Sequence, residues 1–202
     1  MEERQAMLPP FGAELPEWDA TQSRVLDAAD ELIRRRGVGG VTIAELSRRS
    51  GLSRPTVYRS WSDADDVVRS ALLRRVIRIL GSFETPASTR AGLVDDVLRF
   101  SARFRTDAVY GRLLDDEPEA FTRYTLQRVG SSQRMILAWL AAAIRAAQDE
   151  GSVRRGEPRE IAVMLLLIAQ SAVLSHGTVT ELIDEDAWER ELCAALDGHL
   201  RP

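Results

Sequence analysis

The side chains with the clearest binding chemistry lie in the segment Ser-Arg-Pro-Thr-Val-Tyr-Arg, residues 53–59. An arginine can donate two hydrogen bonds to O6 and N7 of one guanine, so Arg54 and Arg59 suit the reading of DNA bases. The methyl group of Thr56 and the neighbouring proline ring offer apolar surface to a thymine methyl group. The hydroxyl groups of Thr56 and Tyr58 suit phosphate oxygens. This combination of side chains fits the major groove of DNA.

Two short predicted helices joined by a tight turn would position this segment. Thr42 and Glu45 have the spacing of a capping box, which predicts the start of the first helix, and Gly51 predicts its end. Ser53 is a suitable N-cap for the second helix, and Pro55 falls in its first turn, where no backbone N–H is required. This is the pattern of a helix-turn-helix, whose second helix lies in the major groove. An ordinary helical hairpin has the same spacing.

Charge is distributed unevenly along the chain. Residues 20–80 contain 12 Arg against 7 acidic residues, whereas residues 1–19 and 81–202 carry net charges of −4 and −5. A basic segment joined to an acidic remainder favours an anionic partner for the basic part alone. Modest local excesses also occur on solvated helices, so charge by itself leaves the partner open.

The composition excludes several classes of enzyme. All 27 basic residues are Arg, which removes the lysine of phosphate-loop NTPases and of Schiff-base enzymes. Cys193 is the single cysteine, so an intramolecular disulfide and a multi-cysteine zinc site are excluded. The acidic run from Asp115 to Glu119 is predicted to be a solvated turn before a helix rather than a metal site, because Pro118 suits the first helical position. We therefore expect no catalytic residues, no metal and no cofactor; a helical enzyme using carboxylates remains an alternative.

The periodicity of apolar residues predicts an all-α fold, since no useful length of sequence alternates as a strand does. Residues 1–19 contain three prolines and no periodicity, and are predicted to be a flexible arm. A DNA-binding domain is expected over 20–80 and a helical ligand-binding and dimerisation domain over 81–202. The helices are expected at 21–36, 42–50, 53–61, 62–80, 88–105, 107–115, 118–149 (with Gly130 a candidate break), 158–176 and 186–200.

Residues 21–80 resemble the DNA-binding domain of the tetracycline-repressor (TetR) family. The resemblance covers about 60 residues and rests on motifs in all three N-terminal helices. The matching positions are Leu26-Asp27-Ala28-Ala29, Gly37, Thr42, Ile43, Ala44, Leu46, Gly51, Ser53, Thr56, Val57, Tyr58 and the aromatic Trp61.

The resemblance implies a homodimeric transcriptional regulator, most often a repressor released from a palindromic DNA operator by a small-molecule ligand. By position, Arg54, Pro55 and Arg59 correspond to base readers, and Ser53 caps their helix. The phosphate contacts implied in the same way are Thr42, Thr56 and Tyr58. The family commonly has a lysine that touches phosphate near the start of its fourth helix. Here that position is Ala64, between two aspartates, so we expect the contact to be absent or replaced by the N-terminus of the helix.

Two further sets of residues are predicted for the helical remainder of the chain. Aromatic side chains commonly line ligand pockets, although core packing accounts for each of them as well. The candidate pocket residues are Phe100, Phe104, Tyr110, Phe121, Tyr124 and Trp139. The candidate dimer-interface residues, from the two most apolar C-terminal segments, are Met164, Leu167, Ile168, Trp188, Leu192 and Leu196.

The longest apolar run, residues 161–174, has 14 residues, fewer than the roughly 20 that a bilayer span requires. The first thirty residues lack the apolar core of a signal peptide. We therefore expect a cytoplasmic protein with no membrane partner. An alternative function is a helical dimeric interaction protein whose helix-turn-helix is vestigial, and the aspartates beside Ala64 give that alternative some support.

Overall fold

The computed structural model describes residues 15–83, 87–126 and 129–202. These residues form helices joined by loops, with no β-strand among them, which confirms the all-α class. The first fourteen residues of the predicted flexible arm lie outside the described residues. By their internal contacts, the described residues divide into an N-terminal unit, residues 16–78 and 106–133, and a C-terminal unit, residues 79–105 and 134–202. The functional division at residue 80 stays a prediction.

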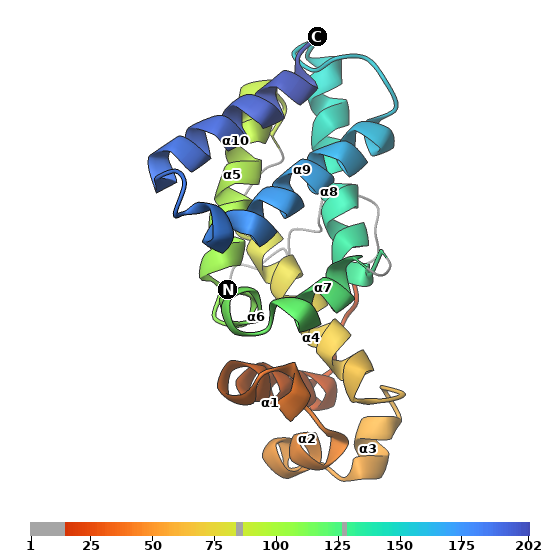
Figure 1. Cartoon of the computed structure of the whole chain (residues 1–202). Helices are drawn as coiled ribbons and strands as arrows, with labels where there is room; N and C mark the ends of the chain where they lie inside the picture. Colours follow the sequence, from red (N-terminus) through yellow and green to blue (C-terminus); the bar gives the residue numbers. More distant parts are fainter. Residues whose placement is uncertain (1–14, 84–86, 127–128) are drawn as a thin grey trace, which may run out of the picture. The chain divides into compact units, whose positions relative to one another are not determined.

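The N-terminal unit gathers seven helical elements, and Figure 1 shows α1, α2 and α3 grouped beside the start of α4. A reciprocal capping box between Asp19 and Gln22 begins the first helix, and Gly37, at φ +73°, ends it. The elements are α1 (Ala20–Arg36), the 3-10 turn η1 (Val38–Gly40), α2 (Ile43–Ser50), α3 (Arg54–Tyr58), most of α4 (Ala64–Leu80), α6 (Tyr110–Asp116) and α7 (Pro118–Leu126).

The C-terminal unit is built from four longer helices: α5 (Arg90–Thr106), α8 (Ser131–Asp149), α9 (Pro158–Val179) and α10 (Glu185–Leu200). Fully buried apolar side chains from all four helices form its core, including Leu93, Ile144, Leu165 and Leu196. The loop after α8 is fixed to the end of α10, because the side chain of Arg154 donates to the carbonyl oxygen of His199 at 2.8 Å.

Two helix boundaries near the helix-turn-helix differ from the predicted ones. The third helix ends at Tyr58 rather than near Trp61, because the N–H groups of both Ser60 and Trp61 bond to the carbonyl of Val57 and tighten the chain into a turn. The fourth helix begins at Ala64, slightly later than expected, with the Asp63 side chain accepting from the Asp66 N–H at 2.7 Å.

The predicted segment 118–149 is divided into α7 and α8, and the candidate break at Gly130 is confirmed. The helix expected to end at His176 continues to Val179. This α9 has 22 residues and is therefore longer than the apolar run seen in the sequence; by length and composition alone it could cross a membrane. One side of it packs on α10 within the C-terminal unit, and the exposed side is also rich in apolar residues.

Candidate nucleic-acid interface

The turn between α2 and α3 has the backbone geometry of a helix-turn-helix. Gly51 adopts the left-handed conformation, φ +68° and ψ 24°, which a residue without Cβ reaches at little cost. Arg24 of α1 donates to the carbonyl oxygen of Ser50 at 2.5 Å, so the end of α2 is capped from a third helix. The buried side chains of Leu46 and Val57 hold α2 and α3 on the core. The two short helices are therefore fixed by packing rather than by their own length.

The start of α3 is fixed by the side chain of Ser53, as predicted. Its hydroxyl accepts a hydrogen bond from the Thr56 N–H at 3.3 Å and lies 2.8 Å from the Thr56 hydroxyl. Thr42 caps α2 in the same way, by accepting from the Glu45 N–H at 3.2 Å. The Glu45 carboxylate pairs with Arg48 instead of returning to the cap, so the reciprocal half of the predicted capping box is not formed.

The outer face of α3 is exposed. Tyr58 has 55% of its surface accessible, a large value for an aromatic residue, and Arg54, Pro55 and Arg59 are also exposed. Thr56 is partly buried, and its hydroxyl already bonds to Ser53. The helix and its C-cap residue Arg59 thus present two arginines, a proline and a tyrosine outward.

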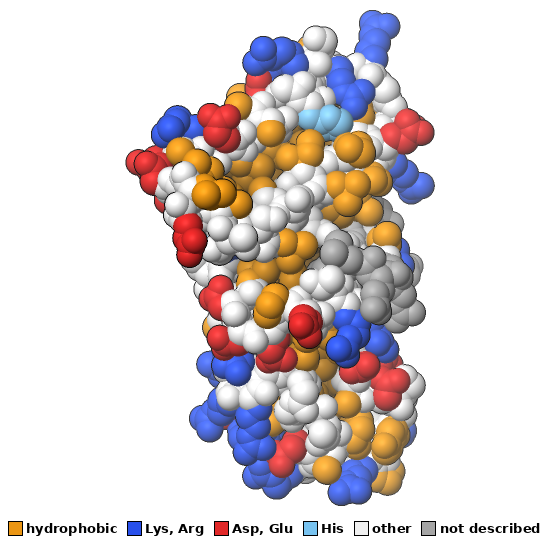
Figure 2. Space-filling model, viewed as in Figure 1, with side chains coloured by type: hydrophobic (Ala, Val, Ile, Leu, Met, Phe, Trp, Pro, Cys, Tyr) orange, Lys and Arg blue, Asp and Glu red, His pale blue; other side chains and the backbone are white. Residues whose placement is uncertain are grey.

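Arg54 of α3 and Arg59, the C-cap of α3, differ from most arginines of this unit in having no carboxylate partner among the described residues. Within residues 20–78, seven of the twelve arginines form ion pairs, and Arg24 caps a carbonyl. Arg54 and Arg59 form no ion pair with any described residue. In Figure 2, basic side chains cluster around α1, α2 and α3. Because their charges are not neutralised by the described part of the chain, Arg54 and Arg59 are available for an anionic or base-edge partner.

The run Arg34-Arg35-Arg36 differs from Arg54 and Arg59, because most of it is paired with carboxylates. Arg35 pairs with Glu31 at 3.1 Å and Arg36 pairs with Glu45 at 3.7 Å. Two of its three arginines therefore have carboxylate partners within the unit.

The aspartates at the start of α4 are also engaged. Asp63 and Asp66 both lie near the guanidinium of Arg69, at 3.8 and 3.5 Å, and Asp65 accepts a hydrogen bond from the Tyr124 hydroxyl at 3.0 Å. Burial, together with the charge of Asp65, raises the pKa of Tyr124 to about 12, so this hydroxyl stays protonated at neutral pH. These carboxylates serve α4 and α7, and Arg69 offsets part of their charge.

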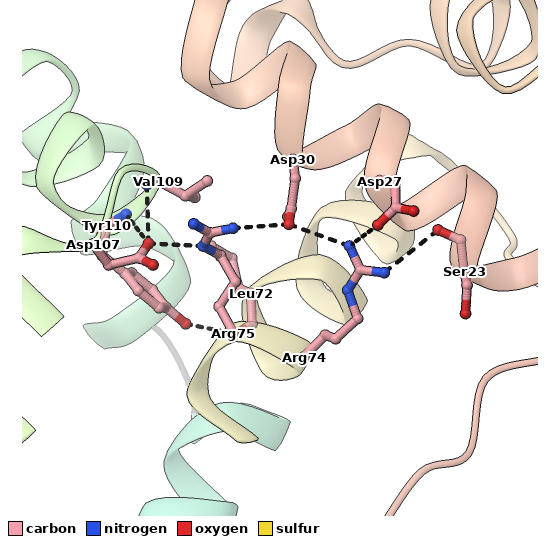
Figure 3. Close-up of polar contacts among 9 residues, drawn as sticks. All are labelled: Ser23, Asp27, Asp30, Leu72, Arg74, Arg75, Asp107, Val109 and Tyr110. Carbon is pink, nitrogen blue, oxygen red and sulfur yellow. Dashed lines mark hydrogen bonds and ion pairs between the residues drawn. The ribbon is translucent and has the colours of Figure 1, made fainter. Parts of the chain in front are cut away.

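A chain of ion pairs, buried except at Asp27, supports the same helices and is not revealed by the sequence (Figure 3). Arg75 of α4 donates from Nη1 to Asp30 of α1 at 2.8 Å and from Nε to Asp107 at 2.7 Å. Arg74 donates to Asp30 at 3.2 Å and to Asp27 at 2.8 Å. No periodicity or spacing predicts pairs between residues so far apart in the chain.

Known proteins resemble both the helix-turn-helix region and most of the whole chain. Residues 25–71 match the family described as "Bacterial regulatory proteins, tetR family". HTH-type transcriptional regulators of Mycobacterium bovis and Mycobacterium tuberculosis are 37% identical over 180 residues, which cover 89% of this chain and 94% of each relative.

The chain belongs to the tetR family of bacterial regulatory proteins.

Solved structures of tetR-type regulators share its fold. SmeT, the repressor of the Stenotrophomonas maltophilia multidrug efflux pump SmeDEF, superposes with a TM-score of 0.60 at 19% identity, over 91% of this chain and 92% of that chain. A transcriptional regulator from Saccharomonospora viridis, in complex with choline, has a TM-score of 0.57 at 22% identity, over 90% and 97% of the two chains. This tetR-family chain is therefore a DNA-binding transcriptional regulator of the helix-turn-helix type.

The predicted pocket residues of this tetR-family chain fall in both units. In the C-terminal unit, the ring of Phe100 lies 6.0 Å from that of Trp139 and 5.9 Å from that of Phe104. In the N-terminal unit, the buried rings of Tyr110 and Phe121 meet edge to face at 6.2 Å. The sixth, Tyr124, is bound to Asp65. Each ring thus has a packing role, and the ligand assignment stays a prediction.

The predicted dimer residues divide into two groups. Met164 and Leu167 are each 48% exposed on α9, and Ile168 is partly exposed. Leu192 and Leu196, in contrast, are buried in the core of the C-terminal unit, so they have almost no accessible surface to give to a second chain. Both side chains face inward within the single chain, and their assignment to the dimer interface stays a prediction.

Trp188, from the same set, is half buried and packs inside the C-terminal unit. The Arg105 guanidinium lies 4.9 Å from its ring centre, and the His176 ring meets it edge to face at 4.9 Å. His176 of α9 therefore packs on α10.

Proposed function

We propose that this protein is a homodimeric, sequence-specific repressor that binds a palindromic operator and is released by a small-molecule effector. The observation that carries the DNA-binding part is the outer face of α3. Arg54, Arg59 and Tyr58 project from a capped and packed helix, and neither arginine is neutralised by a described carboxylate. In this proposal Arg54, Pro55 and Arg59 read bases, while Thr42, Thr56 and Tyr58 contact phosphates.

The exposed face of α9 supports the homodimer. Val163, Met164 and Leu167 are each exposed by more than 40%, on a helix whose most apolar window is only 22% buried. In Figure 2, hydrophobic side chains form a broad area over α9 and α10. Apolar surface of this kind on a regulator is best covered by a second copy, and a twofold pair would place two α3 helices on half-sites about 34–36 Å apart.

Small exposed residues on α10 fit the same arrangement. Ala194, Ala195 and Gly198 lie beside the buried leucines of that helix and are exposed or partly exposed. Small side chains let helices approach closely, so α9 and α10 of two copies would form a four-helix interface.

The effector that we propose is a small organic molecule. Proteins of this fold include one solved with choline, which supports a small organic ligand as the class of effector. The candidates to contact it within the C-terminal unit are Phe100, Phe104 and Trp139, and those within the N-terminal unit are Tyr110, Phe121 and Tyr124. We also propose a cytoplasmic location and no enzymatic activity, as is usual for regulators of this family.

The experiment that tests this function is the selection of bound fragments from random and genomic DNA by the purified protein at near-physiological salt. Enrichment of an inverted repeat would support a dimeric, sequence-specific regulator. An absence of enrichment, also at lower salt, would contradict it. The alternative is a dimeric interaction protein with a vestigial helix-turn-helix; the aspartates near Ala64, which gave it some support, contact Arg69 and Tyr124 within the unit.

A further inference from the structure

Helix α6 belongs to the same compact unit as the helix-turn-helix, although it is distant from it in sequence. The chain leaves the N-terminal unit after Arg78 and returns at Thr106. Two carboxylates flank α6, Asp107 before its first residue and Glu117 after its last. Each of them bonds to a different part of the DNA-binding helices.

Asp107 fixes the start of α6 to α4. Its Oδ1 accepts from Arg75 Nε at 2.7 Å and from the N–H groups of Val109 and Tyr110 at 2.9 and 3.1 Å. The Tyr110 hydroxyl, fully buried, then donates to the carbonyl oxygen of Leu72, also on α4, at 2.7 Å. Burial alone would raise the pKa of Asp107, but the hydrogen bond from Arg75 and those from the backbone outweigh it and lower the pKa below its ordinary value.

Glu117 fixes the end of α6 to the turn between α1 and α2. Its Oε2 accepts from the Val38 N–H at 3.1 Å. The residue before this N–H, Gly37, is the N-cap of η1 and has no side chain with which to cap it. A Cβ at Gly37 would overlap the Glu117 carboxylate, so the glycine both turns the chain and makes room for a cap supplied from the end of α6.

The sequence alone predicts a solvated turn around Glu117, but its side chain is only 23% exposed. The turn that it caps leads directly to Thr42, the N-cap of α2. A displacement of η1 would therefore move the helix that holds α3 against the core. Asp107 and Glu117 together hold α4 and the α1–α2 turn at a fixed spacing.

We propose that Asp107 and Glu117 are positioning residues through which α6 sets the operator affinity of the helix-turn-helix. This inference rests on the proposed function, since it concerns the same DNA-binding surface. The carboxylates touch no DNA. They act by keeping η1 and α4, and through them α2 and α3, in the arrangement that fits the groove.

The test uses the full-length protein and the inverted-repeat duplex selected from the DNA pool, with the dissociation constant measured by fluorescence anisotropy. Glu117→Ala removes the acceptor for the Val38 N–H, and we expect about a tenfold rise in Kd, the scale of one lost charged hydrogen bond. Glu117→Gln keeps a carbonyl oxygen at the same place and should restore Kd to within about twofold. Asp116→Ala is the matched control, because Asp116 is exposed and pairs only with Arg112 of its own helix among the described residues.

Hydrogen exchange at the Val38 amide distinguishes the loss of this one hydrogen bond from a general loss of stability. It should be faster in Glu117→Ala and unchanged in Glu117→Gln, at equal melting temperature. If Glu117→Ala unfolds, Glu117→Asp, one methylene shorter, takes its place and should also raise Kd. A Kd for the folded variant within about twofold of the unsubstituted protein, or lower, would overturn the inference. A lack of sequence-specific binding by the unsubstituted protein would instead contradict the proposed function, and this inference with it.

Discussion

Arg75 and Asp107 are 32 positions apart, yet Arg75 Nε lies 2.7 Å from Asp107 Oδ1 in a region where both side chains are more than four-fifths buried. The Nη1 group of the same guanidinium binds Asp30. One arginine therefore joins α1, α4 and the segment that begins α6 (Figure 3). A buried charge of this kind tolerates the loss of its partners poorly, because the remaining charges keep their desolvation cost.

Replacing Arg75 should therefore destabilise the protein strongly. In Arg75→Met, Asp107 loses its charged partner, whereas Asp30 keeps Arg74, so we expect a loss of about 3 kcal/mol in the free energy of unfolding. Urea denaturation monitored by circular dichroism measures it. Arg78→Met, on the exposed side of the same helix, is the control and should change stability by less than about 0.5 kcal/mol. Equal effects of the two substitutions would show that the ion pairs contribute little.

Two buried carboxylates, Asp107 and Asp96, should change the free energy of unfolding in opposite directions as the pH falls into the acid range. The pKa of Asp107 is lowered in the folded protein, so its ionised form stabilises the fold above its ordinary value of 3.8, and this stabilisation is lost as pH falls through the lower folded pKa. Burial raises the pKa of Asp96, with Arg99 opposing it, so protonation of Asp96 favours the folded state as pH falls.

Substitution separates these two contributions. The stability difference between the unsubstituted protein and Asp107→Asn should shrink below about pH 4. The difference between the unsubstituted protein and Asp96→Asn should change with the opposite sign, in the unsubstituted protein's favour, as pH falls from neutral. Denaturation midpoints measured across the acid range test both. Differences that change in the same direction would contradict this assignment.

The predicted base readers should differ from the paired arginines in their effect on DNA binding. Arg54→Ala and Arg59→Ala should each lower specific affinity by about 1–3 kcal/mol and relax the base preference at one position of each half-site. Thr56→Ala should weaken binding to all sequences alike. Arg35→Ala is the control, since Arg35 pairs with Glu31. An unchanged preference in Arg59→Ala, measured by competition with mutated duplexes, would remove Arg59 from the base readers.

A charge on the exposed face of α9 should prevent dimer formation. Leu167 is 48% exposed, and in a symmetric pair Leu167→Glu places two like charges in an apolar interface. We expect a monomer in sedimentation velocity experiments. Leu167→Met keeps the apolar surface and should remain a dimer. A dimer in Leu167→Glu would show that this face lies outside the interface.

The helices and their caps could be predicted from local sequence. Thr42, Ser53 and Gly51 act within four residues of themselves, so capping chemistry and glycine conformation identify them. The outward position of Arg54 and Arg59 could also be predicted from residue type, because a charged side chain on a short amphipathic helix is rarely buried without a partner.

Interactions across long sequence distances could not be predicted. Nothing near Asp30 or Asp107 indicates that Arg75 will lie between them, since the pairing depends on how three helices pack. The same holds for Glu117, whose acidic surroundings resemble a solvated turn, and for Leu192 and Leu196. Periodicity shows that these leucines share an apolar face but does not decide whether the chain itself or a second copy covers it.

The most direct test of the central claim is a titration of the selected inverted repeat at fixed, near-physiological salt. The duplex is compared with a single half-site and with a scrambled duplex of the same composition. We predict two chains per inverted repeat, weaker binding to one half-site, and a specific affinity at least about 10³-fold above that for the scrambled duplex. Equal affinity for all three duplexes, or saturation at one chain per inverted repeat, would contradict a dimeric, sequence-specific regulator.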